Sequence, residues 1–165
     1  MLHLYWGDGK GKTTAAMGLA LRALGHGRRV VVLQFLKDGT SGEIALLRRC
    51  GAEVHACPNA KFTWLMTEAE RTEARQHNTA ALRAALDNPF DLLVLDEACA
   101  ACRHQLVDEA LLRQAAAMAK QGREVVLTGR DPAPWMQEAA DYSTELRAVR
   151  HPYTQGIPAR EGIEY

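Results

Sequence analysis

The residues best suited to chemistry in this sequence are glycines, lysines and threonines gathered near its start. They read Gly7-Asp8-Gly9-Lys10-Gly11-Lys12-Thr13-Thr14. Glycines let the backbone turn sharply and aim its N–H groups inward, and a helix beginning at Lys12 would add the positive end of its dipole. Lys12 would reach the outer phosphates of a bound anion, and the Thr13 hydroxyl would hold a magnesium ion. We therefore interpret residues 7–14 as a phosphate-binding loop.

The sequence of this loop departs at one position from the Walker A pattern, G-x-x-x-x-G-K-[ST]. The strict pattern would place glycine where the chain has Trp6. The required context is present, because an apolar run at 2–6 precedes the loop and an alanine-rich helical pattern at 15–24 follows it. A glycine-rich turn that binds nothing is the alternative, but two packed lysines would destabilise an empty turn. We expect nucleotide binding.

Further candidates follow two later apolar strands. The run at 91–95 is followed by Asp96 and Glu97, and one of these carboxylates can reach the magnesium of the loop directly or through water. The run at 124–127 leads to Arg130. In a parallel sheet the ligand crevice lies along the carboxyl edge of the strands, which places Arg130 near the nucleotide. A solvated surface arginine explains Arg130 equally well.

Two other groups have a structural and a functional interpretation. Phe62 and Trp64 lie in a segment without a clear period; a core anchor is the usual explanation, and an apolar lid over a large flat ligand is the alternative. Cys99 and Cys102, with His104 nearby, have a spacing that suggests zinc or redox chemistry. Because zinc sites need four ligands and the remaining cysteines complete no such pattern, we favour burial of the two thiols on a helix.

The bulk properties fit one α/β domain over residues 1–165. Twenty basic and twenty acidic side chains cancel, so neither nucleic acid nor a membrane surface is the expected partner. No apolar run approaches the roughly 20 residues of a membrane span, and few cysteines suggest a reducing compartment, so we expect a cytoplasmic protein.

Apolar runs alternate with helical patterns, which predicts parallel strands joined by crossover helices. Strands are expected at 2–6, 30–35, 53–56, 91–95, 124–127 and 144–149, and helices at 13–24, 43–50, 67–86, 107–119 and 135–140.

Taken in order, these motifs closely resemble the ATP:corrinoid adenosyltransferases of the P-loop class. The resemblance covers nearly the whole chain and is carried by residues 7–16, 21–27, 34–37, 62–64, 94–97, 127–130, 151–153 and 156–165. That family transfers the 5′-deoxyadenosyl group of ATP to the cobalt of a corrinoid in cobalamin biosynthesis or salvage, and releases triphosphate. The resemblance implies a three-layer, RecA-like P-loop fold with a mainly parallel six-stranded sheet. It also implies a homodimer and a transient flavoprotein reductant.

Site residues carry over by matching position. Residues 7–14 would hold the triphosphate and Mg²⁺, with Asp96 on the metal directly or through water. Arg22, Glu97 and Arg130 would lie by the nucleotide, while Phe62 and Trp64 would face the corrinoid and exclude water from it. Co(I) is itself a strong nucleophile, so the protein has to align the reactants and stabilise the leaving triphosphate, which Lys10, Lys12 and Mg²⁺ can do.

Some features depart from the family pattern and leave alternatives open. Asp8 stands where asparagine is common, and its charge could weaken ATP binding unless it pairs with a lysine or caps the loop. Trp6 replaces a small residue, and the chain starts at its first strand without the extension of some relatives, which predicts a more open site.

A P-loop ATPase or kinase, in which Glu97 positions a water, is the second candidate function. A nucleotide-dependent corrinoid carrier or regulator is the third.

Overall fold

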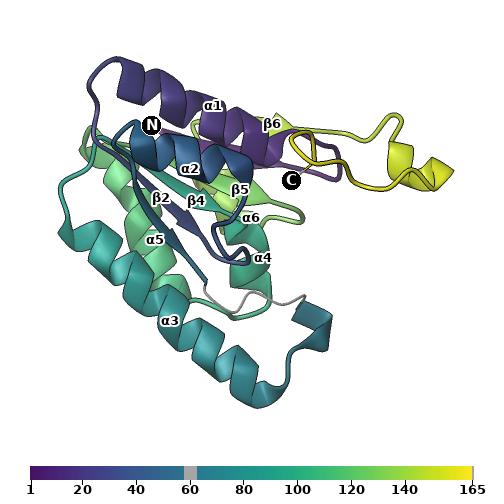
Figure 1. The fold of residues 1–165 in the computed structure, drawn as a ribbon. Coiled ribbons are helices and arrows are strands. Elements are labelled where there is room, and N and C mark those ends of the chain that lie inside the picture. Colours follow the sequence, from purple (N-terminus) through teal and green to yellow (C-terminus); the bar gives the residue numbers. More distant parts are fainter. Residues whose placement is uncertain (58–62, 165) are drawn as a thin grey trace.

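Runs of buried aliphatic residues form a parallel sheet, and helices join its strands (Figure 1). The computed structural model describes residues 1–57 and 63–164, and of Trp64 only the backbone. The elements, with η for 3₁₀ helices, are β1 Leu2–Trp6, α1 Lys12–Gly25, β2 Val30–Gln34, α2 Gly42–Arg49, β3 Glu53–Ala56, η1 Thr63–Leu65, α3 Glu68–Asp87, β4 Leu92–Asp96, α4 Ala98–Arg103, α5 Glu109–Ala117, η2 Met118–Gln121, β5 Glu124–Gly129, α6 Pro134–Ala139, β6 Tyr142–Glu145 and η3 Pro152–Gln155.

The sheet has six strands in the order β3-β2-β4-β5-β1-β6, and every neighbouring pair is parallel. The strands β2 and β4 are buried at every residue, as expected where helices cover both faces of a parallel sheet. The phosphate-loop strand β1 and the acid-bearing strand β4 both pair with β5, so their carboxyl ends open on the same edge of the sheet. The α/β class and the six-stranded parallel sheet are confirmed.

Two apolar cores make the fold three-layered. Side chains alternate between the sheet faces, so Val32 of β2 packs in one core and Leu33 in the other. The helices α1 and α2 cover the first face, through residues such as Met17 and Ile44. The helices α3, α4, α5 and α6 cover the opposite face, as Figure 1 shows for the first three. None of the helices within the described ranges is long and apolar enough to cross a membrane.

Most predicted elements lie where expected, including the helix start at Thr67, whose side chain forms a capping box with Glu70. The prediction of a last strand at 144–149 is wrong, because β6 spans Tyr142–Glu145. Leu146 N still donates to the carbonyl of Trp6 at 2.7 Å, but the Leu146 carbonyl accepts from Gly9 N at 2.7 Å. The chain therefore leaves the sheet ladder at this point and packs on the phosphate loop.

A second correction concerns the helix predicted at 107–119. The helix α5 begins at Glu109 because Asp108 caps it, its side chain accepting from Leu111 N at 3.0 Å. The α-helix ends at Ala117 and tightens into η2 before Gly122, whose φ of 81° breaks it as expected.

Candidate active site at the carboxyl edge of the sheet

The loop between β1 and α1 is shaped by glycines at close approach to another segment. Gly7 and Gly11 have φ values of 110° and 115°, which side chains rarely allow. A Cβ on Gly7 would overlap the carbonyl oxygen of Leu146, and one on Gly9 would lie 2.8 Å from the backbone of Leu146 and Arg147. The glycines therefore turn the loop and also let residues 146–147 lie against it.

Both lysines of the loop donate to backbone carbonyls. Lys12 Nζ donates to Gly9 O at 2.7 Å, and Lys10 Nζ donates to Ile163 O at 2.7 Å. Burial and then the guanidinium of Arg130 lower the pKa of Lys12. Through Lys10 the C-terminal segment, yellow in Figure 1, reaches the loop. A phosphate would be a stronger acceptor than either carbonyl, so both ammonium groups are available to an anion.

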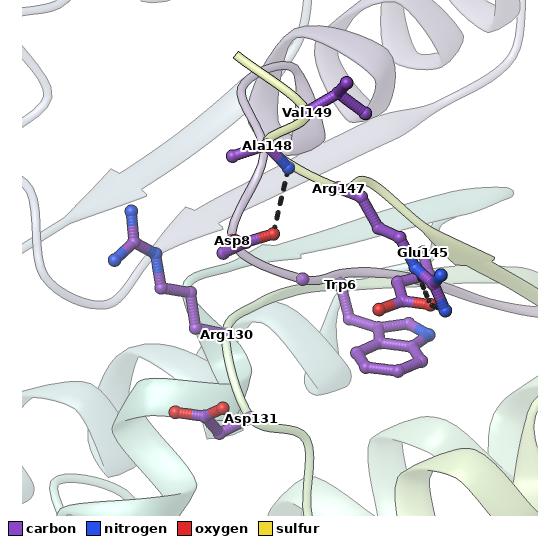
Figure 2. A pocket seen from close by; sticks show the side chains of 9 residues that line it. Trp6, Asp8, Arg130, Asp131, Glu145, Arg147, Ala148 and Val149 are labelled. Atoms are coloured by element: carbon purple, nitrogen blue, oxygen red, sulfur yellow. Dashed lines mark hydrogen bonds and ion pairs between the residues drawn. The ribbon is translucent and has the colours of Figure 1, made fainter. Parts of the chain in front are cut away.

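Asp8 caps the neighbouring segment, and that cap accounts for its place in the loop. Its Oδ1 accepts from Ala148 N at 3.0 Å, as Figure 2 shows. This N–H, the largest cause, holds the pKa of the carboxyl below its usual value. The expectation was a lysine pair or a cap on the loop; the hydrogen bond that the structure shows joins Asp8 to the backbone of residue 148 instead.

A pocket of about 500 Å³ opens beside Asp8 (Figure 2). Trp6 lies in its wall, where the indole Nε1 donates to Ser143 Oγ at 3.1 Å. The lining residues are Trp6, Gly7, Asp8, Arg130, Asp131, Glu145, Arg147, Ala148 and Val149. The large residue at the end of β1 thus joins the loop to the edge strand β6 and shapes the space next to it.

Asp96, at the end of β4, is fully buried, and both oxygens of its carboxylate accept hydrogen bonds. Its Oδ1 accepts from Thr13 Oγ1 at 2.9 Å and from Thr128 Oγ1 at 2.8 Å. Its Oδ2 accepts from Lys37 Nζ at 2.8 Å and from Gln34 Nε2 at 3.1 Å. The structure therefore brings Thr13 of the loop and the predicted acid into direct contact.

Sequence reasoning assigned no role to Gln34, Lys37 or Thr128. Gln34 ends β2, Thr128 lies near the end of β5, and Lys37 follows β2 by three residues. Their positions were the available indication, because polar residues that end apolar parallel strands meet at the same edge of the sheet as Asp96. The phosphate-loop pattern includes an acid and therefore predicts Asp96, but no sequence pattern includes the other three residues.

Glu97 follows Asp96 and lies close to several charged groups. Its backbone is left-handed, with φ 60°, and its N–H donates to Thr128 Oγ1 at 2.9 Å. Burial and then the neighbouring Asp96 raise the pKa of Glu97, while Lys37, Lys12 and Arg130 oppose the shift. Glu97 is therefore at the site, in a setting that favours its protonated form more than an ordinary surface carboxyl.

The two candidate arginines have different positions. Arg130 is exposed, and its charge acts on Lys12, Asp8 and Glu97, so the structure brings it to the loop. Arg22 lies in the last turn of α1, and ten residues of helix separate it from Lys12 by about 15 Å. The structure does not bring Arg22 together with the phosphate loop.

The remaining candidates are not part of this cluster. Thr14 is exposed in the first turn of α1. Phe62 and the side chain of Trp64 lie outside the described residues, so their lid role stays a prediction. Cys99 and Cys102 are buried on α4, as favoured above, and burial raises the pKa of Cys99 to about 12.

The donor set fits a magnesium ion that arrives with a nucleotide. In the part of the chain that the structure describes, no three His, Cys, Asp or Glu side chains gather to hold a metal by themselves. Thr13 and Asp96 would supply two oxygen ligands, and Mg²⁺ usually takes its other ligands from phosphates and water. The buried Gln34 Oε1, without a hydrogen-bond partner among the described residues, is an acceptor for such a water.

Comparison with known proteins places the chain in a family. The family model described as ATP:corrinoid adenosyltransferase BtuR/CobO/CobP matches residues 1–165. A corrinoid adenosyltransferase of Pseudomonas aeruginosa is 39% identical over 171 residues, covering 100% of this chain and 83% of the relative. Those of Escherichia coli K12 and Salmonella typhimurium are 36% and 37% identical, each covering 100% of this chain and 85% of the relative. The chain belongs to the ATP:corrinoid adenosyltransferase family.

Proposed function

We propose that this protein transfers the 5′-deoxyadenosyl group of Mg-ATP to the Co(I) centre of a corrinoid and releases triphosphate. The observation that carries the proposal is the family match over residues 1–165, because it includes the loop, the acid and the C-terminal segment together. Residues 1–165 act in this proposal as one nucleotide-binding unit.

The chemistry explains which side chains the site needs. Co(I) attacks the 5′-carbon, the Co–C bond forms, and the C–O bond to the triphosphate breaks with its electron pair on oxygen. No proton has to move, so neither a side-chain nucleophile nor a general base is required. The needs are alignment of the reactants and stabilisation of growing negative charge on the leaving group.

Residues of the loop stabilise the negative charge that grows on the leaving triphosphate. Lys12 and Lys10 exchange their carbonyl partners, Gly9 O and Ile163 O, for triphosphate oxygens. Thr13 and Asp96 would hold Mg²⁺, which would supply charge neutralisation to the phosphates. Arg130 and Glu97 lie beside these groups and contact the nucleotide. Arg22 is too far from Lys12 to share a phosphate with it, so its contact concerns another part of the ligand.

Phe62 and Trp64 cover the corrinoid in this proposal and exclude water from it, which eases reduction of Co(II) by a transient flavoprotein. If alanine at both positions leaves turnover from Co(II) unchanged, this role is wrong.

The protein acts as a homodimer in the cytoplasm. Sedimentation velocity at working concentration tests the dimer.

A product assay tests the proposed reaction against the two alternatives. The protein is incubated without oxygen with Mg-ATP and chemically reduced cobalamin, and the phosphate product and cobalt ligand are identified. Triphosphate together with a new cobalt–carbon bond supports the transferase. ADP that appears without a corrinoid would indicate an ATPase or kinase, and binding without product would indicate a carrier.

The same assay tests the phosphate role of Lys12. Lys12→Ala removes the partly buried cation of the loop and is expected to abolish transfer, a loss of at least about 100-fold. Lys120→Ala removes an exposed lysine on η2 and serves as the matched control. Near-normal transfer by Lys12→Ala would refute the role.

A further inference from the structure

Lys37 is a cation at the site that neither the loop pattern nor the acid accounts for. Its Nζ lies 2.8 Å from Asp96 Oδ2 and 3.2 Å from Thr13 Oγ1. The side chain of Asp96 is 0% exposed and that of Lys37 is 34% exposed. The ammonium group thus enters from the solvent side and contacts a buried carboxylate and the loop hydroxyl together.

The ion pair explains how Asp96 stays buried in the protein without ligand. A buried carboxylate needs a compensating cation and hydrogen bonds, and among the described residues Lys37 is the ion-pair partner of Asp96. The Lys37 ammonium, 2.8 Å from a carboxylate that is 0% exposed, supplies that cation. Lys37 is therefore a charged partner for Asp96.

The position of this ammonium coincides with the one a metal would need. Thr13 and Asp96 carry oxygen atoms that fit Mg²⁺, and Lys37 Nζ lies within 3.2 Å of both. An ammonium and a divalent ion cannot share that position, because like charges a few ångströms apart in a partly buried site repel strongly. One of the two has to leave when the other is present.

We infer that Lys37 occupies the metal position in the nucleotide-free protein and gives it up when Mg-ATP binds. The surroundings permit this as a side-chain movement. The Lys37 carbonyl accepts from Cys57 N at 3.0 Å, which holds the backbone, while the side chain is one-third exposed. The residue follows β2 in a loop, so no helix or strand hydrogen bond has to break.

The exchange has a consequence for the reaction and rests on the proposed Mg-ATP chemistry of the site. Lys37 keeps Asp96 neutralised before the nucleotide arrives, so the acid does not repel the incoming triphosphate. After the exchange, the released ammonium lies beside the metal-bound phosphates as a third lysine, with Lys10 and Lys12. Lys37 is thus a positioning residue for the metal and the leaving group.

Binding of the metal alone tests the inference without ATP or corrinoid, so its failure is separate from failure of the proposed reaction. The melting temperature of the full chain is measured with and without millimolar Mg²⁺, for the unmodified protein and for Lys37→Gln. Gln keeps a donor for Asp96 Oδ2 but no charge. Arg48→Gln is the matched control, because Arg48 lies on α2 near the same loop and contacts Gly39 O.

Mg²⁺ alone is expected to leave the unmodified protein and Arg48→Gln nearly unchanged and to raise the melting temperature of Lys37→Gln. The apparent Mg²⁺ dissociation constant should be at least about tenfold lower in Lys37→Gln. Equal Mg²⁺ responses of the unmodified protein and Lys37→Gln would overturn the inference. If Lys37→Gln does not fold, Lys37→Met is measured with Mg²⁺ present from the start; recovery of folding by Mg²⁺ supports the exchange, and failure to recover contradicts it.

Discussion

The two sides of the phosphate loop are built in different ways. On the inner side, polar side chains at strand and helix ends meet around the buried Asp96, which contacts Thr13 and Lys37. On the outer side, Asp8 and Gly9 contact the backbone of residues 146–148, and Lys10 contacts Ile163 near the C-terminus. The inner side is a buried side-chain network, and the outer side consists mainly of exposed contacts to irregular backbone.

This difference separates two tasks. A buried carboxylate whose two oxygens both accept hydrogen bonds is held in place before the ligand arrives, which suits a metal and a leaving group. Exposed contacts to carbonyls are individually weak and can be exchanged for phosphate oxygens. We infer that the inner side determines where the triphosphate lies, and that the outer side adjusts around it.

The largest effect is expected on the inner side. Asp96→Ala leaves the Lys37, Gln34 and Thr128 donors without their buried acceptor, and should lower the free energy of unfolding by about 3 kcal/mol. Urea denaturation measures it. Glu68→Ala is the control, because its 4.0 Å ion pair with Arg71 lies at the surface, with the Glu68 side chain 97% exposed, and little change is expected. A loss for Asp96→Ala no greater than that of the control would contradict the buried network.

A smaller effect is expected where the outer segment lies on the loop. Gly7→Ala places a Cβ against the Leu146 carbonyl at a φ of 110°, and should destabilise the protein by about 1–3 kcal/mol. Gly18→Ala, on α1 with open space where the new Cβ would lie, should be neutral or stabilising by up to about 1 kcal/mol. The two melting temperatures should move in opposite directions or differ clearly. If Gly7→Ala is as stable as Gly18→Ala, residues 146–147 do not lie against the loop.

The smallest effect is expected at Asp8. Asp8→Asn keeps an acceptor for Ala148 N and removes a negative charge beside the phosphates, so stability should change little and Mg-ATP should bind slightly more tightly. The pKa of Asp8 is lowered in the folded protein, so its stabilising contribution is present above its usual pKa and is lost as the pH falls through the lowered value. Asp8→Asn should remove that part of the acid dependence. An unchanged acid profile would count against the cap.

The sequence predicted the inner side better than the outer one, for a physical reason. Asp96 and Thr13 belong to patterns in which residue type, spacing and strand ends all agree, and the parallel sheet follows from buried apolar runs. The cap on Asp8 depends on where residues 146–148 come to lie after β6 ends, and that is a tertiary contact without local pattern. The last strand was predicted wrongly at the same place, because extended residues beyond Glu145 pair with the loop instead of the sheet.

Lys37 shows a different kind of limit. Its type and position were visible in the sequence, but a lysine three residues after a strand is compatible with many roles. Only the distances to Asp96 and Thr13 distinguish a counter-ion at the metal position from an ordinary surface cation.

Competition binding measures whether the loop binds the triphosphate as the leaving group. Inorganic triphosphate with Mg²⁺ and adenosine are each titrated against bound Mg-ATP, with the unmodified protein and with Lys12→Ala. We expect triphosphate to displace ATP from the unmodified protein at much lower concentration than adenosine does, and to lose this advantage in Lys12→Ala. Displacement by adenosine alone, with triphosphate ineffective, would contradict the account.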